Sequence, residues 1–167
     1  MSATPISSWR WYGVALLAAL LDQITKGVIA STVDLAEQVP VTSFFNLVYV
    51  LNPGAAFSFL AEAGGWQRYF FIVLALLVSA WLVLMLRTHR SRYEAFGLSL
   101  VLGGAVGNVV DRIATGAVVD FLDFHWNGVH WPAFNLADVF INAGVVLLLL
   151  AAFREGSPKV VPERPGT

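Results

Sequence analysis

Cysteine is absent from this chain of 167 residues, and charged residues are few. Without cysteine, the protein forms no disulfide, carries no thiolate nucleophile and holds no cysteine-ligated metal. Charged residues make up only 13% of the chain, against about 25% in a typical soluble domain. The net charge of -1 lacks the basic excess of a nucleic-acid-binding surface, so we expect no nucleic-acid partner.

Hydrophobic residues, in contrast, make up 57% of the chain, and its mean hydropathy is +0.71. Four apolar segments have close to the roughly 20 residues that a helix needs to cross a bilayer. They cover residues 11–30, 69–86, 95–112 and 134–153. We therefore predict an all-α polytopic membrane protein, with four transmembrane helices in a single membrane-embedded domain over residues 1–154. The polar, proline-rich residues 155–167 are predicted to be a flexible cytoplasmic tail.

The basic residues predict which side of the membrane each connection faces. Seven of the ten lie on the side of the two termini: Arg10, Arg87, Arg90, Arg92, Arg154, Lys159 and Arg164. Because cytoplasmic loops carry the excess of lysine and arginine, we predict both termini in the cytoplasm and residues 31–68 and 113–133 outside. The first segment also resembles a cleavable signal peptide that ends at Ala30. Its removal would move the basic C-terminus outside, so we expect this segment to stay.

The first outer connection carries strand-forming residues. In VPVTSFFNLVYVLNPGAAFSF, β-branched and aromatic residues surround a turn signal at Asn52-Pro53-Gly54. This pattern predicts a strand, a turn and a second strand. Apolar strands beside a membrane indicate a small sheet on the outer surface, whose faces contact lipid or an extended peptide.

Two charges interrupt the first apolar segment. Asp22 and Lys26 are four residues apart, so they share one helix face and can neutralise each other. We interpret them either as an internal ion pair or as a polar contact to the active region or substrate. At a rise of about 1.5 Å per residue, Lys26 is expected near the outer interface, where its side chain can also reach water.

The third segment ends in a polar face after a run of glycines. The glycines allow another helix backbone to approach closely. They are Gly103, Gly104 and Gly107. Spacings of three and four residues put Asn108, Asp111 and Arg112 on one helix face at the outer end. For Asp111 and Arg112 we favour a hydrogen-bonded and ion-paired cluster that ties the helix to its neighbours, while the role of Asn108 stays open.

Asp120 and Asp138 are the carboxylates whose positions point to chemistry. Each lies at the edge of an apolar run, where a carboxylate is a functional candidate. We expect each near the outer end of a helix that flanks one loop, which brings the two together. Two such carboxylates share a proton, so one can activate water while the other protonates the substrate, as in an aspartic peptidase. Alternatively, Asn135 and Asp138 cap the fourth helix, and Asp120 pairs with Arg112 or lies in a turn.

Other chemistries have weaker patterns. Asp123 is a third carboxylate, but its neighbours predict an exposed interfacial loop. With His125 and His130 it matches no common zinc spacing, so we expect no metal. Ser58 and Lys26 could in principle form a nucleophilic serine–lysine pair, but no local spacing in the sequence supports one.

Five motifs occur in order along nearly the whole chain: LDQITK, NPGAAFSF, GGAVGNVVDR, VVDF and PAFNLAD. In this order and spacing they resemble lipoprotein signal peptidase, or signal peptidase II, of bacterial inner membranes. The resemblance implies a membrane aspartic peptidase with a small outer β-cradle and no cofactor. It implies cleavage of diacylglyceryl-modified prolipoproteins before the lipidated cysteine, and binding of the cyclic peptide globomycin. We expect a monomer in contact with membrane lipid.

Carried over motif by motif, the resemblance makes Asp120 and Asp138 the catalytic pair. Other matching residues are expected to shape or support the site: Asn52, Gly54, Asn108, Asp111, Arg112, Asn135, Ala137, Asp22 and Lys26. Pro53 stands at a variable position of the family and is expected to restrict its neighbour to extended conformations without loss of activity. Aromatic residues of the outer connections are expected to form a lid or interfacial anchor: Phe57, Phe59, Trp66, Trp126 and Trp131.

A non-enzymatic alternative is a small membrane transporter or scaffold built around the buried charges of the first and third segments. This alternative predicts that losing Asp22 or Lys26 is more damaging than losing Asp120 or Asp138. A peptidase predicts the reverse order, with folding intact in variants of the catalytic pair.

Overall fold

A computed structural model describes residues 9–54, 64–88 and 91–155 of the protein. In these ranges the chain forms four helices and four strands. The helices are α1 (Trp9–Thr32), α2 (Trp66–Arg87), α3 (Arg92–Ala114) and α4 (Leu136–Glu155). The strands are β1 (Gln38–Thr42), β2 (Phe45–Asn52), β3 (Val118–Trp126) and β4 (Val129–His130).

All four predicted apolar segments are helices, and each is long and apolar enough to cross a membrane. Large hydrophobic side chains cover the outside of the bundle, as in the case of Leu77, which is 66% exposed. An apolar outer surface of this kind suits lipid contact, so the predicted four-helix membrane architecture is confirmed. The predicted tail lies outside the described residues, apart from Glu155, which ends α4.

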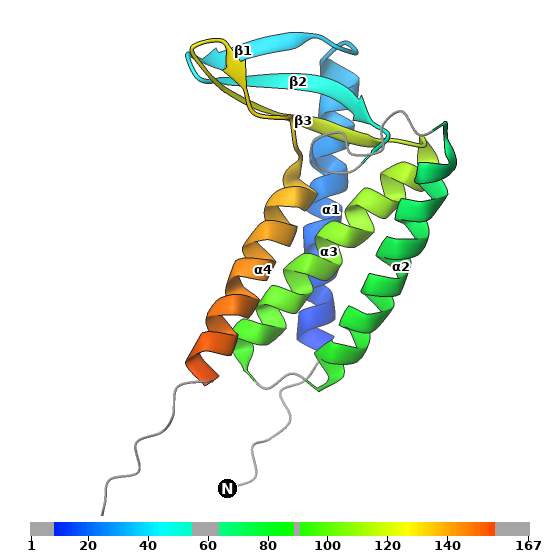
Figure 1. Cartoon of the computed structure of the whole chain (residues 1–167), viewed down its shortest axis with the longest axis vertical. Helices are drawn as coiled ribbons and strands as arrows, with labels where there is room; N and C mark the ends of the chain where they lie inside the picture. Colours follow the sequence, from blue (N-terminus) through cyan, green and yellow to red (C-terminus); the bar gives the residue numbers. More distant parts are fainter. Residues whose placement is uncertain (1–8, 55–63, 89–90, 156–167) are drawn as a thin grey trace, which may run out of the picture.

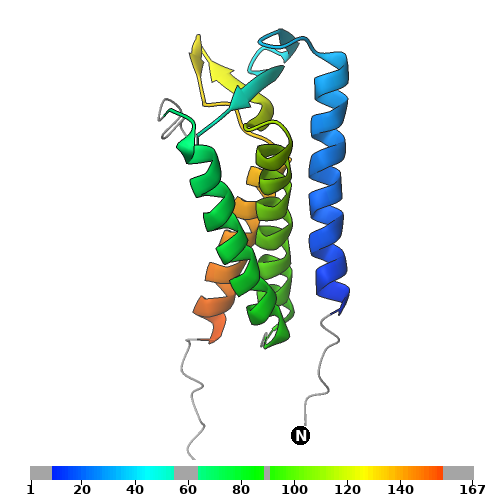
Figure 2. The same ribbon diagram turned by 90° about the vertical axis from the view of Figure 1, so that its right-hand side faces the viewer.

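Helix α3 lies at the centre of the bundle and packs against the other three helices (Figures 1 and 2). Its glycines allow the close contacts, as predicted. A Cβ atom at Gly103 would meet Ala15 and Ala18 of α1, and one at Gly104 would meet Ala137 of α4. Helix α3 is therefore the scaffold on which α1 and α4 bring their polar side chains together.

The strands form one antiparallel sheet in the order β1-β2-β3-β4. The sheet lies across one end of the helix bundle, whereas α1 begins and α4 ends at the opposite end (Figure 1). A small apolar core of Ile29, Val33 and Phe121 joins α1 to β3. The predicted small sheet next to the membrane helices is therefore present, and it is anchored to the helix that carries Asp22 and Lys26.

An additional hairpin precedes the predicted turn, because β1 and β2 are joined through Ser43 and Phe44. The predicted turn is present: β2 ends at Asn52, the chain bends at Pro53 and Gly54, and the Gly54 N–H donates to Asn52 Oδ1 at 3.0 Å. Strand-forming residues continue up to this point, and a proline, which has no N–H to donate, then stops the ladder. The second strand predicted beyond it lies outside the described residues.

The second outer connection contains β3, which we did not predict as a strand. It pairs with β2 over a register that includes Val50 opposite Asp120 and Asn52 opposite Val118. Asp120 therefore lies in a strand, and the prediction that it lies near a helix end is wrong. The strand has nine residues and is rich in β-branched and aromatic side chains, but two acidic residues interrupt this pattern, and pairing with β2 completes the strand.

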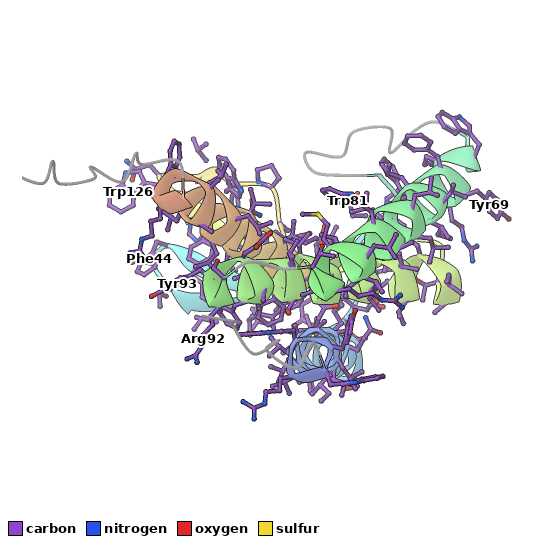
Figure 3. All side chains as sticks on the ribbon, turned by 90° about the horizontal axis from the view of Figure 1, so that it is seen from below. Phe44, Tyr69, Trp81, Arg92, Tyr93 and Trp126 are labelled. Atoms are coloured by element: carbon purple, nitrogen blue, oxygen red, sulfur yellow. The ribbon has the colours of Figure 1, made fainter. Side chains whose placement is uncertain are left out.

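Aromatic side chains surround the end of the bundle that carries the sheet. Figure 3 shows Phe44 and Trp126 on the α4 side of the molecule and Tyr69 on the α2 side. The predicted anchor residues within the described ranges are all more than half exposed: Trp66, Trp126 and Trp131. Exposed tryptophans at this end of the molecule suit the headgroup region of a bilayer. The other two predicted anchors, Phe57 and Phe59, lie outside the described residues.

Candidate active site

The carboxylates of Asp120 and Asp138 meet at Asn135, which is fully buried. Its side-chain Nδ2 donates to Asp120 Oδ1 at 2.7 Å. Its backbone N–H donates to Asp138 Oδ2 at 3.2 Å. The expectation that the two carboxylates lie together is confirmed, although one comes from a strand and the other from a helix. We call Asp120 and Asp138 the carboxylate pair.

Asn135 and Asp138 also cap helix α4, as the alternative interpretation predicted. The Asp138 N–H donates to Asn135 Oδ1 at 3.0 Å, and the bond from the Asn135 N–H to Asp138 completes a reciprocal capping box. This cap fixes Asp138 in the first turn, where the helix dipole favours a negative charge. Capping therefore positions Asp138 beside Asp120 and does not compete with a role in chemistry.

Asp120 is only 3% exposed, and burial raises the pKa of its carboxyl to about 6. The hydrogen bond from Asn52 Nδ2, at 3.0 Å, and that from Asn135 oppose this rise in pKa, while the nearby Asp138 adds to it. The two asparagines are neutral donors, so they orient the carboxyl without supplying a positive charge. A carboxyl with a pKa close to neutral can both give and take a proton at physiological pH.

Asn108 links the carboxylate pair to Lys26. Its Nδ2 donates to Asp138 Oδ1 at 3.0 Å, and its Oδ1 accepts a hydrogen bond from Lys26 Nζ at 2.9 Å. The sequence left the role of Asn108 open. The structure places it between α1, α3 and α4, where it orients Asp138.

Lys26 lies inside a buried charged cluster, which we define as Asp22, Lys26 and Asp111. Its Nζ is 2.8 Å from Asp22 Oδ2 and 2.9 Å from Asp111 Oδ2. The predicted Asp22–Lys26 ion pair is therefore confirmed. The expectation that Lys26 reaches water is wrong, because it is 3% exposed and two carboxylates hold it in the interior.

Asp22 connects the charged cluster to helix α4. Its Oδ1 accepts a hydrogen bond from the backbone N–H of Ala137 at 2.8 Å. Ala137 is fully buried, and a Cβ atom at Gly107 would collide with the Asp22 carboxylate. Gly107 therefore leaves the space that Asp22 needs, and the backbone N–H of Ala137 accounts for Ala137 as a supporting residue.

Gln23 is a supporting residue that the sequence analysis missed. Its Nε2 donates to Asp111 Oδ1 at 2.8 Å and to the Gly107 carbonyl at 3.1 Å. A side-chain amide next to a charge inside an apolar segment was the signal that could have identified it. Gln23 adds a second link between α1 and α3.

Asp111 and Arg112 bind different partners: Asp111 belongs to the charged cluster with Lys26, whereas Arg112 lies outside that cluster. Arg112 Nη2 donates to the Gly54 carbonyl at 2.6 Å, and its guanidinium lies over the Phe71 ring at 5.0 Å. The Gly54 N–H in turn donates to Asn52 Oδ1 at 3.0 Å, so this chain of contacts leads to Asp120. The carboxylate of Asp120 is held by amides, not by an ion pair with Arg112 as one alternative supposed.

A cavity of about 580 Å³ opens at the carboxylate pair. Its size is within the range of small-molecule and peptide sites. It is lined by Asn52, Asn108, Arg112, Val118, Asp120, Trp131, Pro132, Ala133, Phe134, Asp138, Ile141 and Asn142. Polar amides and both carboxylates lie in the same cavity as apolar wall residues, an arrangement that can hold an extended peptide next to water.

Asp123 does not lie in an exposed loop, so that prediction is wrong. It is 4% exposed, accepts a hydrogen bond from Asn46 Nδ2 at 2.7 Å, and lies 2.9 Å from His130 Nδ1. Burial raises the pKa of the Asp123 carboxyl, but the hydrogen bonds from His130 and Asn46 outweigh it, so the pKa lies below its usual range. The burial comes from pairing with β2 and β4, which local sequence does not reveal.

The remaining alternatives find no support in the part of the chain that the structure describes. Across residues 9–54, 64–88 and 91–155, no group of three or more histidine and acidic side chains could hold a metal ion. Lys26 is engaged in the charged cluster, and Ser58 lies outside the described residues.

Comparison with known proteins gives the family. The sequence profile of the family described as Signal peptidase (SPase) II matches residues 14–154. The chain belongs to the signal peptidase II family. It is therefore an aspartic peptidase that removes signal peptides from prolipoproteins, and a multi-pass bacterial membrane protein.

Individual relatives are similar in sequence to this protein over most of its length. The lipoprotein signal peptidase of Cupriavidus necator is 54% identical over 154 residues, which is 92% of this chain and 86% of the relative. The lipoprotein signal peptidase of Azoarcus sp. is 51% identical over 158 residues, which is 93% of this chain and 90% of the relative. A solved bacterial membrane enzyme superposes with a TM-score of 0.84 at 28% identity over 100% of both chains. The chain therefore shares its fold with this solved bacterial membrane enzyme.

Proposed function

We propose that Asp120 and Asp138 are the catalytic residues of this signal peptidase II, and that the substrate is cleaved before a diacylglyceryl-modified cysteine. The observation that carries the proposal is the pair of carboxylates joined by Asn135 on the wall of one cavity. Because the pKa of the Asp120 carboxyl is raised to about 6, Asp120 is the member that carries the proton at the start of the reaction.

The proposed reaction uses one water molecule and conserves the proton of the pair. Asp138 removes a proton from water as its oxygen attacks the scissile carbonyl carbon, and Asp120 donates its proton to the carbonyl oxygen. The resulting gem-diol collapses with cleavage of the C–N bond. The leaving amine takes the proton from Asp138, and the diol returns one to Asp120. The neutral amides of Asn52, Asn108 and Asn135 hold both carboxyl groups in place throughout.

The position of the cavity supports a substrate bound at the membrane surface. Asp138 lies in the first turn of α4 and Asp120 lies in the sheet that covers the same end of the bundle (Figure 1). A lipid attached to the residue after the scissile bond can therefore remain in the bilayer while the bond enters the cavity. Most basic residues lie on the side of the two termini. This distribution supports a cytoplasmic location of both termini and a location of the proposed cavity on the outer face of the inner membrane.

The remaining expectations extend the same proposal. Residues 1–154 act as one membrane-embedded peptidase domain, and the enzyme works as a monomer in contact with lipid. A cyclic peptide of the globomycin type competes with substrate by occupying the cavity at the carboxylate pair. The inhibitor concentration that halves the rate should therefore rise linearly with substrate concentration, while the inhibition constant stays the same.

The test incubates purified enzyme in lipid with a diacylglyceryl-modified prolipoprotein and with its unlipidated counterpart, and identifies the products by mass spectrometry. Asp120→Asn and Asp138→Asn should retain fold and lose cleavage, whereas Asp34→Asn, at an exposed carboxylate, should cleave normally. Cleavage by a folded Asp120→Asn or Asp138→Asn variant would overturn the pair. Equal cleavage of both substrates would overturn the requirement for lipid.

The charged cluster does not favour the transporter or scaffold alternative. Lys26 is in contact with Asp22, Asp111 and Asn108 in a closed set of partners. Breaking such a buried set by Lys26→Met should destabilise the protein by about 3–5 kcal/mol, because two carboxylates lose their cation. We expect the yield of folded protein to fall, whereas the Asp120→Asn and Asp138→Asn variants should fold and lose cleavage.

A further inference from the structure

One wall of the cavity is a short segment between β4 and α4. Residues 131–134 lead from the end of β4 to Asn135, and all four line the cavity. At its far end the segment is fixed by Asn135, which holds both members of the carboxylate pair. The position of this wall therefore depends on how its other end, at His130, is held.

Backbone pairing alone holds that other end weakly. Strand β4 has only two residues, paired with His125 and Trp126 of β3. Beyond it, Trp131 N–H donates to the Phe124 carbonyl at 2.8 Å, and Phe134 exchanges backbone hydrogen bonds with Leu122. A ribbon this short is marginal in water, so side-chain contacts must contribute to its position.

Side-chain contacts at this place include the stacked rings of Phe124 and Phe134 and the hydrogen bond between His130 and Asp123. His130 Nδ1 lies 2.9 Å from one carboxylate oxygen of Asp123 and 3.0 Å from the other. The carboxylate is buried and also accepts from Asn46 at 2.7 Å, so β2, β3 and β4 are joined at one point. His125 stacks on the His130 ring, with 4.9 Å between ring centroids.

We propose that His130 and Asp123 are positioning residues that hold the 131–134 wall of the cavity for substrate binding. They act through the wall and do not touch the reacting atoms. This inference rests on the proposed function, since it assumes that the substrate occupies the cavity at the carboxylate pair.

The geometry separates binding from chemistry. The carboxylate pair is held by Asn52, Asn108 and Asn135, and these contacts do not involve His130. Displacement of the wall should therefore raise KM and leave kcat nearly unchanged. A residue that only stabilised the fold would lower the amount of active enzyme and leave the KM of the remaining enzyme the same.

The test compares three substitutions in lipid-reconstituted enzyme with a diacylglyceryl-modified prolipoprotein. His130→Leu should raise KM about tenfold with kcat within about twofold. His130→Asn places an amide N–H where Nδ1 lies and should restore most of the affinity. His125→Leu, which removes the stacked ring but keeps the bond to Asp123, should leave KM within about twofold. If His130→Leu fails to fold, His130→Gln, whose amide lies at the Nε2 position, takes its place with the same expected rise in KM.

A binding measurement keeps this inference separate from the catalytic proposal. In an Asp120→Asn background, the dissociation constant of the uncleaved substrate should rise by the same factor when His130→Leu is added. An unchanged dissociation constant, a fall in kcat at constant KM, or an Asn variant as defective as the Leu variant would overturn the positioning role. Cleavage by Asp120→Asn itself would instead overturn the assignment of the catalytic pair.

Discussion

Asp120 and Asp123 lie three residues apart on β3, and each accepts a hydrogen bond from an asparagine of β2. Both are almost fully buried, at 3% and 4% exposed. Yet the pKa of Asp120 is raised to about 6, whereas the pKa of Asp123 is lowered. Burial alone therefore does not determine the protonation of a carboxyl on this strand.

Burial is the largest cause of the raised pKa of Asp120, and the partners of each carboxyl add to the difference. Asp120 has a neutral amide, from Asn135, and another carboxylate, Asp138, nearby. Asp123 has an imidazole, which can carry a positive charge and so favours the ionised acid. In the proposed reaction, one end of β3 thus supplies a proton, whereas the carboxyl at the other end joins three strands.

The largest expected effect is on activity. Asp120→Asn should lower kcat by at least about a thousandfold, because it removes the acid of the reaction. Asp123→Asn should lower kcat/KM by only about tenfold, through KM, because the imidazole loses its charged partner. Steady-state kinetics on both variants, normalised to folded enzyme, would show whether the two carboxylates differ in this way; equal losses of kcat would remove the distinction.

The next effect is on stability, and its sign is opposite for the two residues. The pKa of Asp120 rises from 3.8 to about 6 on folding, so wild-type stability falls as the pH rises from about 4 to about 6. Asp120→Asn removes this loss and should unfold at a higher temperature than wild type above pH 6, with the difference shrinking towards pH 4.

For Asp123 the folded pKa is below the unfolded value of 3.8, so its contribution to stability is present above that pH and is lost as the pH falls. Asp123→Asn should therefore destabilise the protein at pH 7, by about 1–3 kcal/mol. Thermal unfolding in detergent at pH 4, 5.5 and 7 measures both variants together. A higher unfolding temperature for Asp123→Asn at pH 7 would contradict this assignment.

The smallest effect concerns the asparagines of β2. Asn52→Leu removes a hydrogen bond that lowers the pKa of Asp120, so the alkaline limb of the kcat/KM profile should move upward by about one pH unit. Asn46→Leu is the matched control, because its partner Asp123 takes no proton in the reaction. A profile that stays in place for Asn52→Leu, or moves for Asn46→Leu, would show that Asp120 does not set this limb.

Local patterns in the sequence were sufficient for several parts of the site. Hydropathy located the helices, the four-residue spacing of Asp22 and Lys26 located their ion pair, and the spacing of Asn135 and Asp138 located the cap of α4. These features form between residues close in the chain, so their signals lie in short windows of sequence. The motifs also gave the family, which the comparisons confirm.

Tertiary contacts decided the rest. Asp123 is buried because Asn46, 77 residues away, and β4 cover it. Lys26 is held in the interior by Asp22, by Asp111 and by Asn108, which is 82 residues away. Asp120 lies in a strand because β2 pairs with it, not because its own neighbours require one. The sequence by itself determined which carboxylates stand at the edge of hydrocarbon. Only the packing of distant elements decided how each carboxyl is buried and which groups it meets, and these together set the pKa of each carboxyl.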